Sequence, residues 1–361
     1  MLVAFLLLAL GLVVLTLGAD KFVEGASSLA KKFNVSELAI GLTVVAFGTS
    51  APELIVNVFA AVNGNNGIAY GNIIGSNSFN LLLILGIAGL IHPLTAHPNI
   101  VKKDTPYSFI AAVLVFLLVN DLLLWGIAPS GGGINDYPAT AEVKDAAGVV
   151  TGTISFGGIM SRIDAGILLL FFAYFLYYVF KNTSADKDAE DEGIKELSPL
   201  LTALYTIGGL AGLVVGGKLI VDNAVFLATQ WGMSEKMIGL TIVSAGTSLP
   251  ELATSAIAAY RKKSDIAIAN VIGSNIFNIF FILATSAVIA PIPFETLMNF
   301  DIYVLLGGTV VFFVFLLMSK PVHMEGSTAS APILGRVFHR WQAFLFLIAY
   351  IVYVWYLIIR G

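Results

Sequence analysis

The feature that most constrains this chain is an internal repeat with a glutamate embedded in apolar sequence. The stretch GLTVVAFGTSAPEL at 41–54 recurs as GLTIVSAGTSLPEL at 239–252, at an offset of 198 residues. Each copy places one glutamate, Glu53 or Glu251, in the middle of a long apolar segment. A carboxylate at that depth in lipid costs at least ~2.5–3.5 kcal/mol. The fold must therefore give both carboxylates a compensating partner.

Composition indicates that this chain is an integral membrane protein. Of the 361 residues, 58% are hydrophobic and 12% are charged, whereas soluble domains have about 25% charged residues. Apolar runs of about twenty residues recur, which favours helices over a barrel. The absence of cysteine excludes disulfides and thiolate metal sites. No basic face is available, so nucleic acid is not an expected partner.

The apolar runs predict an all-α polytopic membrane protein with ten transmembrane helices in two sets of five. The first run has a counterpart at 200–217 and lacks a basic flank and a cleavage site, so we interpret it as a helix rather than a signal peptide. A short amphipathic connector follows it at 20–36. The predicted helices are 2–19, 36–62, 67–91, 105–124 and 162–180, then 199–220, 234–260, 265–290, 300–318 and 340–359.

The two sets predict an inverted-topology repeat. The offset of 198 needs no gap from the first helix to the third. Five is an odd number, so the second set must enter the membrane from the opposite side, which places a binding site at the midplane between the halves. The predicted units are 1–181, an acidic inner linker at 182–198, and 199–361.

Two polar segments interrupt the pattern. The insert at 126–161 includes EVKDAAGVVTGTISF, which predicts a short hairpin with no assigned function. The linker at 182–198 contains six acids, and we interpret it as a solvated flexible segment rather than a calcium site. With the amino terminus outside, 14 of the 19 Lys and Arg residues lie in inner loops. The positive-inside rule then puts both termini outside, in a cell membrane.

Each glutamate belongs to a helix that its own sequence interrupts. Pro52 lacks an N–H and clashes with the carbonyl of Gly48, so it breaks the helix and frees polar backbone in lipid. Thr49 and Ser50 lie four and three residues before Glu53, on the same helix face. The second copy repeats this arrangement with Thr247, Ser248, Pro250 and Glu251. These are hard oxygen donors that suit Ca²⁺ or, in smaller subsets, Na⁺.

The following helix in each half adds a polar stripe at a spacing of four residues. The first stripe is Asn72, Ser76 and Asn80, and the second is Asn270, Ser274 and Asn278. Amide oxygens can bind a cation without adding charge. For Asn72 and Asn270, hydrogen bonding between helices is an equally good interpretation.

At these residues the chain resembles the calcium/cation antiporter superfamily, in its prokaryotic sodium/calcium exchanger branch. The two α-repeats of that family match GTSAPE at 48–53 with GSNSFN at 75–80, and GTSLPE at 246–251 with GSNIFN at 273–278. The resemblance implies alternating access, with the first and sixth helices as a peripheral gate. It also implies a shared set of Ca²⁺ and Na⁺ ligands: Glu53, Glu251, Thr49, Ser50, Thr247, Ser248, Ser76, Ser274, Asn80, Asn278 and the carbonyls of Ala46 and Ser244.

One departure from the family pattern concerns charge. Many members have an aspartate where this chain has Asn278, so the site has at most the two charges of Glu53 and Glu251. One Ca²⁺ or two Na⁺ neutralise it, whereas a third Na⁺ would leave it positive. A stoichiometry of three to one and a dependence on potassium therefore stay open.

The sequence thus predicts a secondary active antiporter that exchanges Na⁺ for Ca²⁺, without a cofactor, for which a monomer is sufficient. A proton-coupled or broader divalent-cation antiporter on the same scaffold is the main alternative. A channel is disfavoured by the inverted repeat and the shared site. An enzyme is disfavoured because the sequence has no H-E-x-x-H motif and no paired catalytic aspartates.

Overall fold

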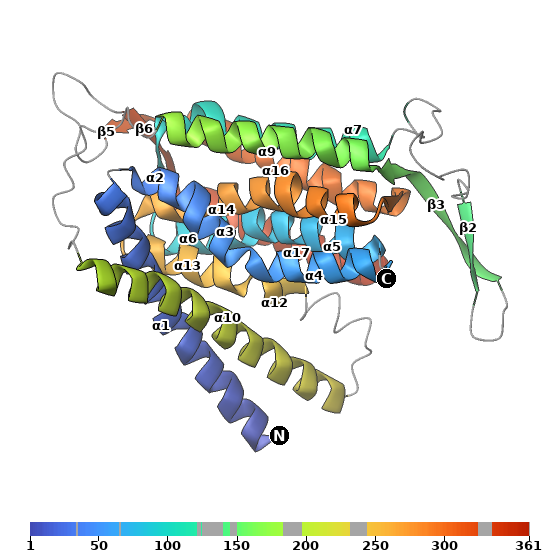
Figure 1. Cartoon of the computed structure of the whole chain (residues 1–361), viewed down its shortest axis with the longest axis horizontal. Helices are drawn as coiled ribbons and strands as arrows, with labels where there is room; N and C mark the ends of the chain where they lie inside the picture. The colour runs from blue at the N-terminus through green and yellow to red at the C-terminus, as the bar shows by residue number, and fades with distance from the viewer. Residues whose placement is uncertain are drawn as a thin grey trace.

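The fold is known from a computed structural model, which describes residues 1–33, 35–64, 66–120, 124, 140–144, 150–182, 197–231, 244–323 and 334–360. Among these residues, seven helices are long and apolar enough to cross a membrane, or eight if one bent pair counts as a span. Figure 1 shows most helices lying along one direction as a bundle, with α1 and α10 crossing it obliquely on one side. The molecule is thus mostly helical, as the composition predicts.

Helices α1 (Leu2–Phe33) and α10 (Pro199–Gln230) have 32 residues each. At 1.5 Å per residue each is about 48 Å long, well beyond the ~30 Å hydrocarbon core. The predicted helices 2–19 and 199–220 are therefore too short, and the connector predicted at 20–36 is wrong over its first fourteen residues. Those residues stay helical because Phe22, Val23 and Ala26 continue the buried face of α1.

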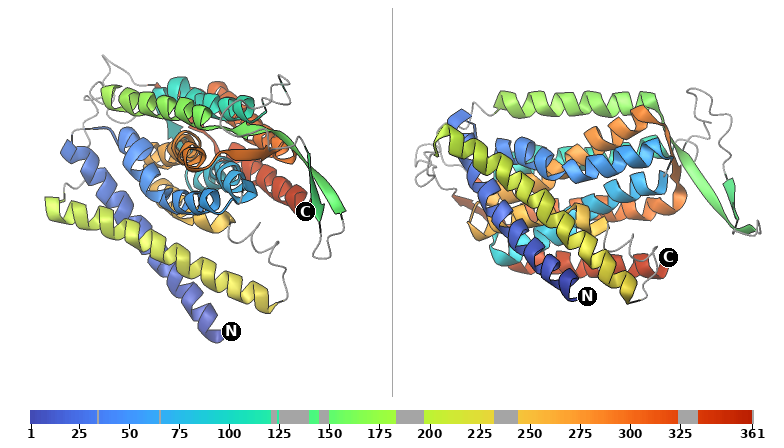
Figure 2. Two further views of the ribbon diagram at one scale, coloured as in Figure 1. Left: turned by 45° about the vertical axis from the view of Figure 1, so that its right-hand side comes forward. Right: turned by 60° about the horizontal axis from the view of Figure 1, so that its bottom comes forward.

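The backbones of α1 and α10 touch where they cross, because both helices have glycine there. A Cβ on Gly18 would lie 2.8 Å from the carbonyl carbon of Gly212, and one on Gly209 would lie 2.5 Å from the backbone nitrogen of Phe22. Glycine is what permits this approach. The two helices form a pair on the outside of the bundle: the left view of Figure 2 shows them beside it and the right view shows them crossing in front of it.

The first glutamate motif lies on a broken helix. It consists of α2 (Glu37–Ile40), a π-helical segment (Gly41–Val45), α3 (Ala46–Thr49) and α4 (Ala51–Val62). The axis bends by 48° at Ser50, one residue before the turn that contains Pro52. The second motif shows the same break at Ser248, between α12 (Ser244–Thr247) and α13 (Leu249–Tyr260). Residues 234–243 of that predicted helix lie outside the described residues.

The best-buried spans are the helices that follow the two motifs. One is α5 (Asn66–Ser78), a π-helical segment (Phe79–Ile84) and α6 (Leu85–Ile91), and its counterpart is α14 (Ser264–Phe277), a π-helical segment (Asn278–Leu283) and α15 (Ala284–Ile289). In the most apolar 18-residue window of each span, 78% and 94% of the residues are buried. They form the centre of the bundle, which matches the predicted third and eighth helices.

Four further helices surround this centre. They are α7 (Thr105–Val119), which follows a π-helical segment (Ile100–Asp104), α9 (Arg162–Asn182), α16 (Asn299–Met318), which follows a short 3₁₀ turn (Thr296–Met298), and α17 (Arg340–Arg360). Each matches a predicted helix; α7 ends at Val119, and residues 121–123 of that predicted helix lie outside the described residues. Figure 1 shows α9 and α7 along one edge, on the side of the bundle away from α1 and α10.

Two small antiparallel sheets join segments that are distant in the sequence. Strands β1 (Leu94–Ala96), β6 (Leu334–Phe338) and β5 (Pro321–His323) form one in the order β1-β6-β5. Strands β2 (Thr140–Lys144), β3 (Val150–Met160) and β4 (Ile292–Glu295) form the other in the order β2-β3-β4. The hairpin predicted in the insert is therefore confirmed, but its second strand extends to pair with β4, which the sequence alone did not predict.

Candidate cation site

The helix breaks place both glutamates in the middle of the bundle. Glu53 lies in the first turn of α4 and Glu251 in the first turn of α13, and neither side chain is exposed. The amino-terminal turn of a helix has unpaired N–H groups and a positive dipole end, which favours a carboxylate there. Each break therefore creates a helix start that stabilises the glutamate in its first turn.

Each glutamate accepts a hydrogen bond from the serine of the other motif. The Ser50 hydroxyl donates to Glu251 Oε1 at 2.8 Å, and the Ser248 hydroxyl donates to Glu53 Oε1 at the same distance. Both serines sit at the helix breaks and are buried. The two motifs thus face each other and form one site, with residues about 200 positions apart in contact.

The asparagines of the next helices support the broken backbone. Asn72 Nδ2 donates to the carbonyl oxygen of Glu53, and Asn270 Nδ2 donates to that of Glu251, both at 3.2 Å. Their Oδ1 atoms accept from the hydroxyls of Thr247 at 3.4 Å and Thr49 at 3.1 Å. These contacts match the alternative considered for Asn72 and Asn270, hydrogen bonding between helices.

Asn77 and Asn275 link the two central helices, and sequence reasoning missed them. Asn77 Nδ2 donates to the carbonyl of Asn275 at 3.2 Å, and Asn275 Nδ2 donates to that of Asn77 at 3.3 Å. Their Oδ1 atoms accept from Asn278 Nδ2 at 2.9 Å and Asn80 Nδ2 at 3.1 Å. These bonds engage the amide nitrogens of Asn80 and Asn278 and leave their oxygens available. The signal was present, because both residues are the third letter of the repeated GSN.

Several oxygens at this site have no hydrogen-bond partner among the described residues. These buried atoms are Glu53 Oε2, Glu251 Oε2, Asn80 Oδ1, Asn278 Oδ1 and Ser274 Oγ. An unsatisfied buried polar group costs about 1–3 kcal/mol, and more when it is charged. All five belong to the predicted ligand set. Carboxylate, amide and hydroxyl oxygens are the donors that Ca²⁺ and Na⁺ accept, so a cation would satisfy the group together.

The other predicted ligands differ in how far the protein already uses them. Ser76 Oγ lies 3.5 Å from Glu53 Oε1. The carbonyl of Val45 lies 3.0 Å from the Thr49 hydroxyl and shares its single hydrogen with Asn270 Oδ1. The carbonyl of Ala46 accepts the backbone N–H of Ser50 at 3.0 Å, which leaves its second lone pair for a cation. Ser244 is the first residue of α12.

Two further residues hold the amides in place and also escaped the sequence analysis. Asn57 Oδ1 accepts from Asn72 Nδ2 at 2.7 Å, and Asn57 Nδ2 donates to the carbonyl of Ala69 at 3.2 Å. In the second half Ser255 Oγ accepts from Asn270 Nδ2 at 2.9 Å. Both follow their glutamate by four residues, which places them one turn further along the same face.

Two further acids, Glu24 and Asp222, match at the same offset of 198 residues but lie outside the site. Glu24 lies within α1, where Lys21 is 3.0 Å away and Arg261 is 3.8 Å away. Asp222 lies within α10 and pairs with Lys218 at 2.9 Å. Both are partnered by cations on the surface of the helix pair, and neither contributes to the group of unpartnered oxygens.

Comparison with known proteins identifies the family. The profile of the family described as "Sodium/calcium exchanger protein" matches residues 3–181 and 201–359. The chain belongs to the sodium/calcium exchanger family. It is a multi-pass membrane protein of a cation-exchanging antiport family, and the motifs that carried the resemblance are those that form the candidate site.

Relatives and a solved structure agree with this assignment. The chain is 36% identical to the putative antiporter CaxA of Alkalimonas amylolytica over 324 residues, which is 88% of this chain and 90% of CaxA. It is 32% identical to the sodium/calcium exchanger MaX1 of Methanosarcina acetivorans over 337 residues, 87% of this chain and 91% of MaX1. A structure of the sodium-calcium exchanger NCX_Mj matches with a TM-score of 0.73 and 30% identity, covering 98% of this chain and 99% of that one.

Proposed function

We propose that the protein is a secondary active antiporter that exchanges Na⁺ for Ca²⁺ by alternating access. Both ions would use shared sites around Glu53 and Glu251. The observation that supports this most is the group of five buried oxygens without a hydrogen-bond partner among the described residues, two of which belong to carboxylates. The proposed ligands are Glu53, Glu251, Thr49, Ser50, Thr247, Ser248, Ser76, Ser274, Asn80, Asn278 and the carbonyls of Ala46 and Ser244.

Charge neutralisation at the shared site explains obligatory exchange. The described residues contain no group of three or more His, Cys, Asp or Glu side chains that could hold a metal ion. The charge of the proposed site therefore comes from Glu53 and Glu251. One Ca²⁺ or two Na⁺ cancel it, whereas an empty site keeps two buried negative charges. Moving those charges across the apolar barrier is costly, so the empty protein does not change access.

The proposed architecture is an inverted repeat of five plus five helices, with α1 and α10 as the moving gate. The contacts of Ser50, Asn72 and Asn77 recur at an offset of 198 residues, which supports two matching halves. Figure 1 shows the carboxyl terminus toward the end of the bundle that faces the β2–β3 hairpin, opposite β5 and β6. Both termini would lie outside the plasma membrane. Protease protection of either terminal tag in intact cells would contradict this orientation.

Sodium-driven ⁴⁵Ca²⁺ uptake into proteoliposomes tests the function. Glu53→Gln and Glu251→Gln should each lower the rate by at least about 100-fold, because a charged ligand worth ~3 kcal/mol is lost. Asp222→Asn is the matched control, since it removes a membrane-helix acid that pairs with Lys218 outside the site. Rates like those of the control in either glutamine variant would refute the site.

The same preparation separates sodium coupling from proton coupling. Calcium uptake is measured first under a sodium gradient with pH clamped, and then under a pH gradient without sodium. We expect uptake in the first case alone. Uptake driven by the pH gradient alone would replace sodium with protons as the coupled ion while leaving the carboxylate site in place.

A further inference from the structure

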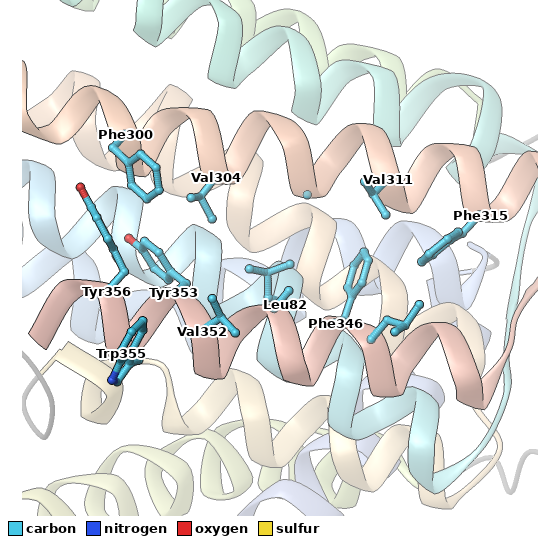
Figure 3. Close-up of a pocket in the computed structure, with 13 residues that line it drawn as sticks. Leu82, Phe300, Val304, Val311, Phe315, Phe346, Val352, Tyr353, Trp355 and Tyr356 are labelled. Atoms are coloured by element: carbon cyan, nitrogen blue, oxygen red, sulfur yellow. The ribbon is translucent and has the colours of Figure 1, made fainter. Parts of the chain in front are cut away.

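A groove lies between α16 and α17, away from the cation site. It has a volume of about 580 Å³, within the ~300–1,000 Å³ range of ligand pockets. Figure 3 shows Phe300 and Val304 on one side, Val352 and Phe346 on the other, and Leu82 between the two helices. Its walls are almost entirely apolar. Nothing in the exchange mechanism requires this space.

The first half of the chain provides a counterpart for each wall of the groove. Helix α9 corresponds to α17, because arginine at the start of each bonds the end of a central helix. Arg162 donates to the carbonyls of Val288 and Ile289, and Arg340 donates to that of Ile91. Ten residues further along each helix, an aromatic ring contacts a matching phenylalanine of a central helix. The ring centroids of Phe172 and Phe277 are 4.9 Å apart, and those of Tyr350 and Phe79 are 5.6 Å apart.

Helix α7 corresponds in the same way to α16. Each helix has a buried carboxylate near its start, Asp104 just before α7 and Asp301 in the first turn of α16. The buried side chains then follow the same spacing in both helices. They are residues 105, 108, 112, 115 and 119 of α7 and residues 302, 305, 309, 312 and 316 of α16. Tyr107 therefore corresponds to Val304, three residues after the carboxylate.

Aromatic rings fill the first half where the groove opens in the second. The Tyr107 and Phe280 rings lie 5.4 Å apart, the Phe171 and Phe280 rings 5.6 Å, and Tyr107 also donates to the carbonyl of Phe171 at 2.6 Å. Their counterparts are Val304, Leu82 and Ala349, and all three line the groove. The groove thus exists because three large rings are replaced by three smaller side chains.

The surroundings of the groove indicate what fills it. Val311 is 41% exposed and Val352 is 56% exposed, so the groove is continuous with apolar surface that faces lipid. A bilayer offers hydrocarbon to such a surface, and apolar volume without contacts is unfavourable. Trp355 and Tyr356 line one end of the groove, and residues of this kind mark the interface of a bilayer.

We propose that this groove is a binding site for one acyl chain of a membrane phospholipid. The chain lies between α16 and α17, and the headgroup lies at the end near Trp355 and Tyr356. The acyl chain contacts Leu82, which lies two residues after Asn80 in the same π-helical segment. A bound lipid therefore stabilises the segment that presents the Asn80 oxygen to the cation site.

Exchanging the side chains between the halves tests the proposal. The filled variant has Leu82→Phe, Val304→Tyr and Ala349→Phe, and the opened variant has Tyr107→Val, Phe171→Ala and Phe280→Leu. Native mass spectrometry after detergent exchange counts the phospholipids that remain bound. We expect the wild type to keep one that the filled variant loses, and the opened variant to gain one.

Two results would overturn the proposal. One is equal retention of phospholipid by the wild type and the filled variant. The other is a wild-type dimer that the filled variant converts to a monomer, which would make the groove an interface between two copies of this chain. Should the triple variant not fold, Ala349→Phe alone is used, in a background in which the tryptophans at 125, 231 and 341 are replaced by phenylalanine so that Trp355 is the single tryptophan.

Fluorescence of that single tryptophan gives the second readout. Phospholipid with brominated acyl chains is titrated into detergent micelles, and the quenching of Trp355 is recorded. Saturable quenching at low lipid content that Ala349→Phe removes supports the site. Quenching that rises only with bulk lipid content, alike with and without the substitution, contradicts it.

Discussion

The surroundings of Glu53 and Glu251 match closely near the carboxylates and differ further out. Both acids accept a serine hydroxyl from the other half at 2.8 Å. Further out, Asn57 Oδ1 accepts from Asn72 in the first half where the shorter Ser255 Oγ accepts from Asn270 in the second, and Ser76 lies 3.5 Å from Glu53, at the outer limit of a hydrogen bond. The contacts at the carboxylates are thus duplicated, whereas the side chains that support Asn72 and Asn270 differ. A pair of symmetrical carboxylates can therefore have unequal dependence on the bound ion.

The largest expected effect comes from the contact that the two halves share most evenly. Asn77→Ala should leave the Nδ2 of Asn278 unpaired and remove the bond to the Asn275 carbonyl, which keeps the backbone N–H of Asn278. Asn275→Ala should leave the Nδ2 of Asn80 unpaired and remove the bond to the Asn77 carbonyl. At about 1–3 kcal/mol for the unpaired amide and about 0.5–1.5 kcal/mol for the other bond, each variant loses about 1.5–4.5 kcal/mol of stability. Thermal unfolding in detergent measures it.

Thr309→Val serves as the control for that pair. Its hydroxyl donates only within its own helix, to the carbonyl of Leu305 at 2.8 Å, so its loss should matter little. A melting temperature for either asparagine variant that equals the control's would remove Asn77 and Asn275 from the support of the site.

The next effect tests whether the contacts at the carboxylates are equivalent. Ser50→Ala and Ser248→Ala each remove one hydrogen bond to a carboxylate, worth about 1.5–3 kcal/mol, so exchange should fall about 10–100-fold in both. Sodium-driven ⁴⁵Ca²⁺ uptake measures the two rates beside Ser286→Ala, whose hydroxyl donates to its own helix. If one serine variant kept the wild-type exchange rate and the other were inactive, the two halves would contribute unequally even at the carboxylates.

A smaller effect should separate the two halves. Ser274→Ala removes a hydroxyl that has no hydrogen-bond partner in the part of the chain that the structure describes. It should leave the melting temperature in ion-free buffer unchanged and reduce the stabilisation by added Ca²⁺, because stabilisation by a ligand follows its affinity. Ser76→Ala should lower both the melting temperature in ion-free buffer and the stabilisation by added Ca²⁺. Identical behaviour of the two variants would erase the difference between the halves.

The smallest effect is expected from exchanging the two side chains that support Asn72 and Asn270. Asn57→Ser and Ser255→Asn together give each half the support of the other. Because single neutral hydrogen bonds contribute about 0.5–1.5 kcal/mol, the calcium affinity should shift less than about tenfold. Isothermal titration with Ca²⁺ measures this. An effect as large as that of the serine variants would place Asn57 among the groups that contact the ion.

The repeat predicted most of the residues that the structure brings together at the candidate site, and those that it missed are placed by non-local contacts. Glu53, Ser50 and their counterparts were found because chain spacing puts them on one helix face. Asn77 was missed because it lies one residue away from Ser76, on a face whose neighbour only the fold reveals. The length of α1 was missed because Lys21 and Glu24 were taken for a connector. Their charges pair with each other and with Arg261 instead.

Pairing across the chain also escaped prediction, because nothing local marks it. The strand β4 has only four residues, and β1 has three. Each gains its partner from a segment that lies far away in sequence, β3 for β4 and β6 for β1. Such short strands have no periodicity of their own to detect. The fold class and the helix positions did not depend on them.

These cross-pairings have a consequence for biosynthesis. The chain leaves the ribosome amino terminus first, so Glu53 enters the membrane before Ser248 has been made, and β1 waits for β6. Until then the first half has a buried acid and a strand edge without their partners. The nascent protein must therefore shelter an incomplete half in the insertion machinery or in lipid, and its final structure forms only when translation has nearly finished.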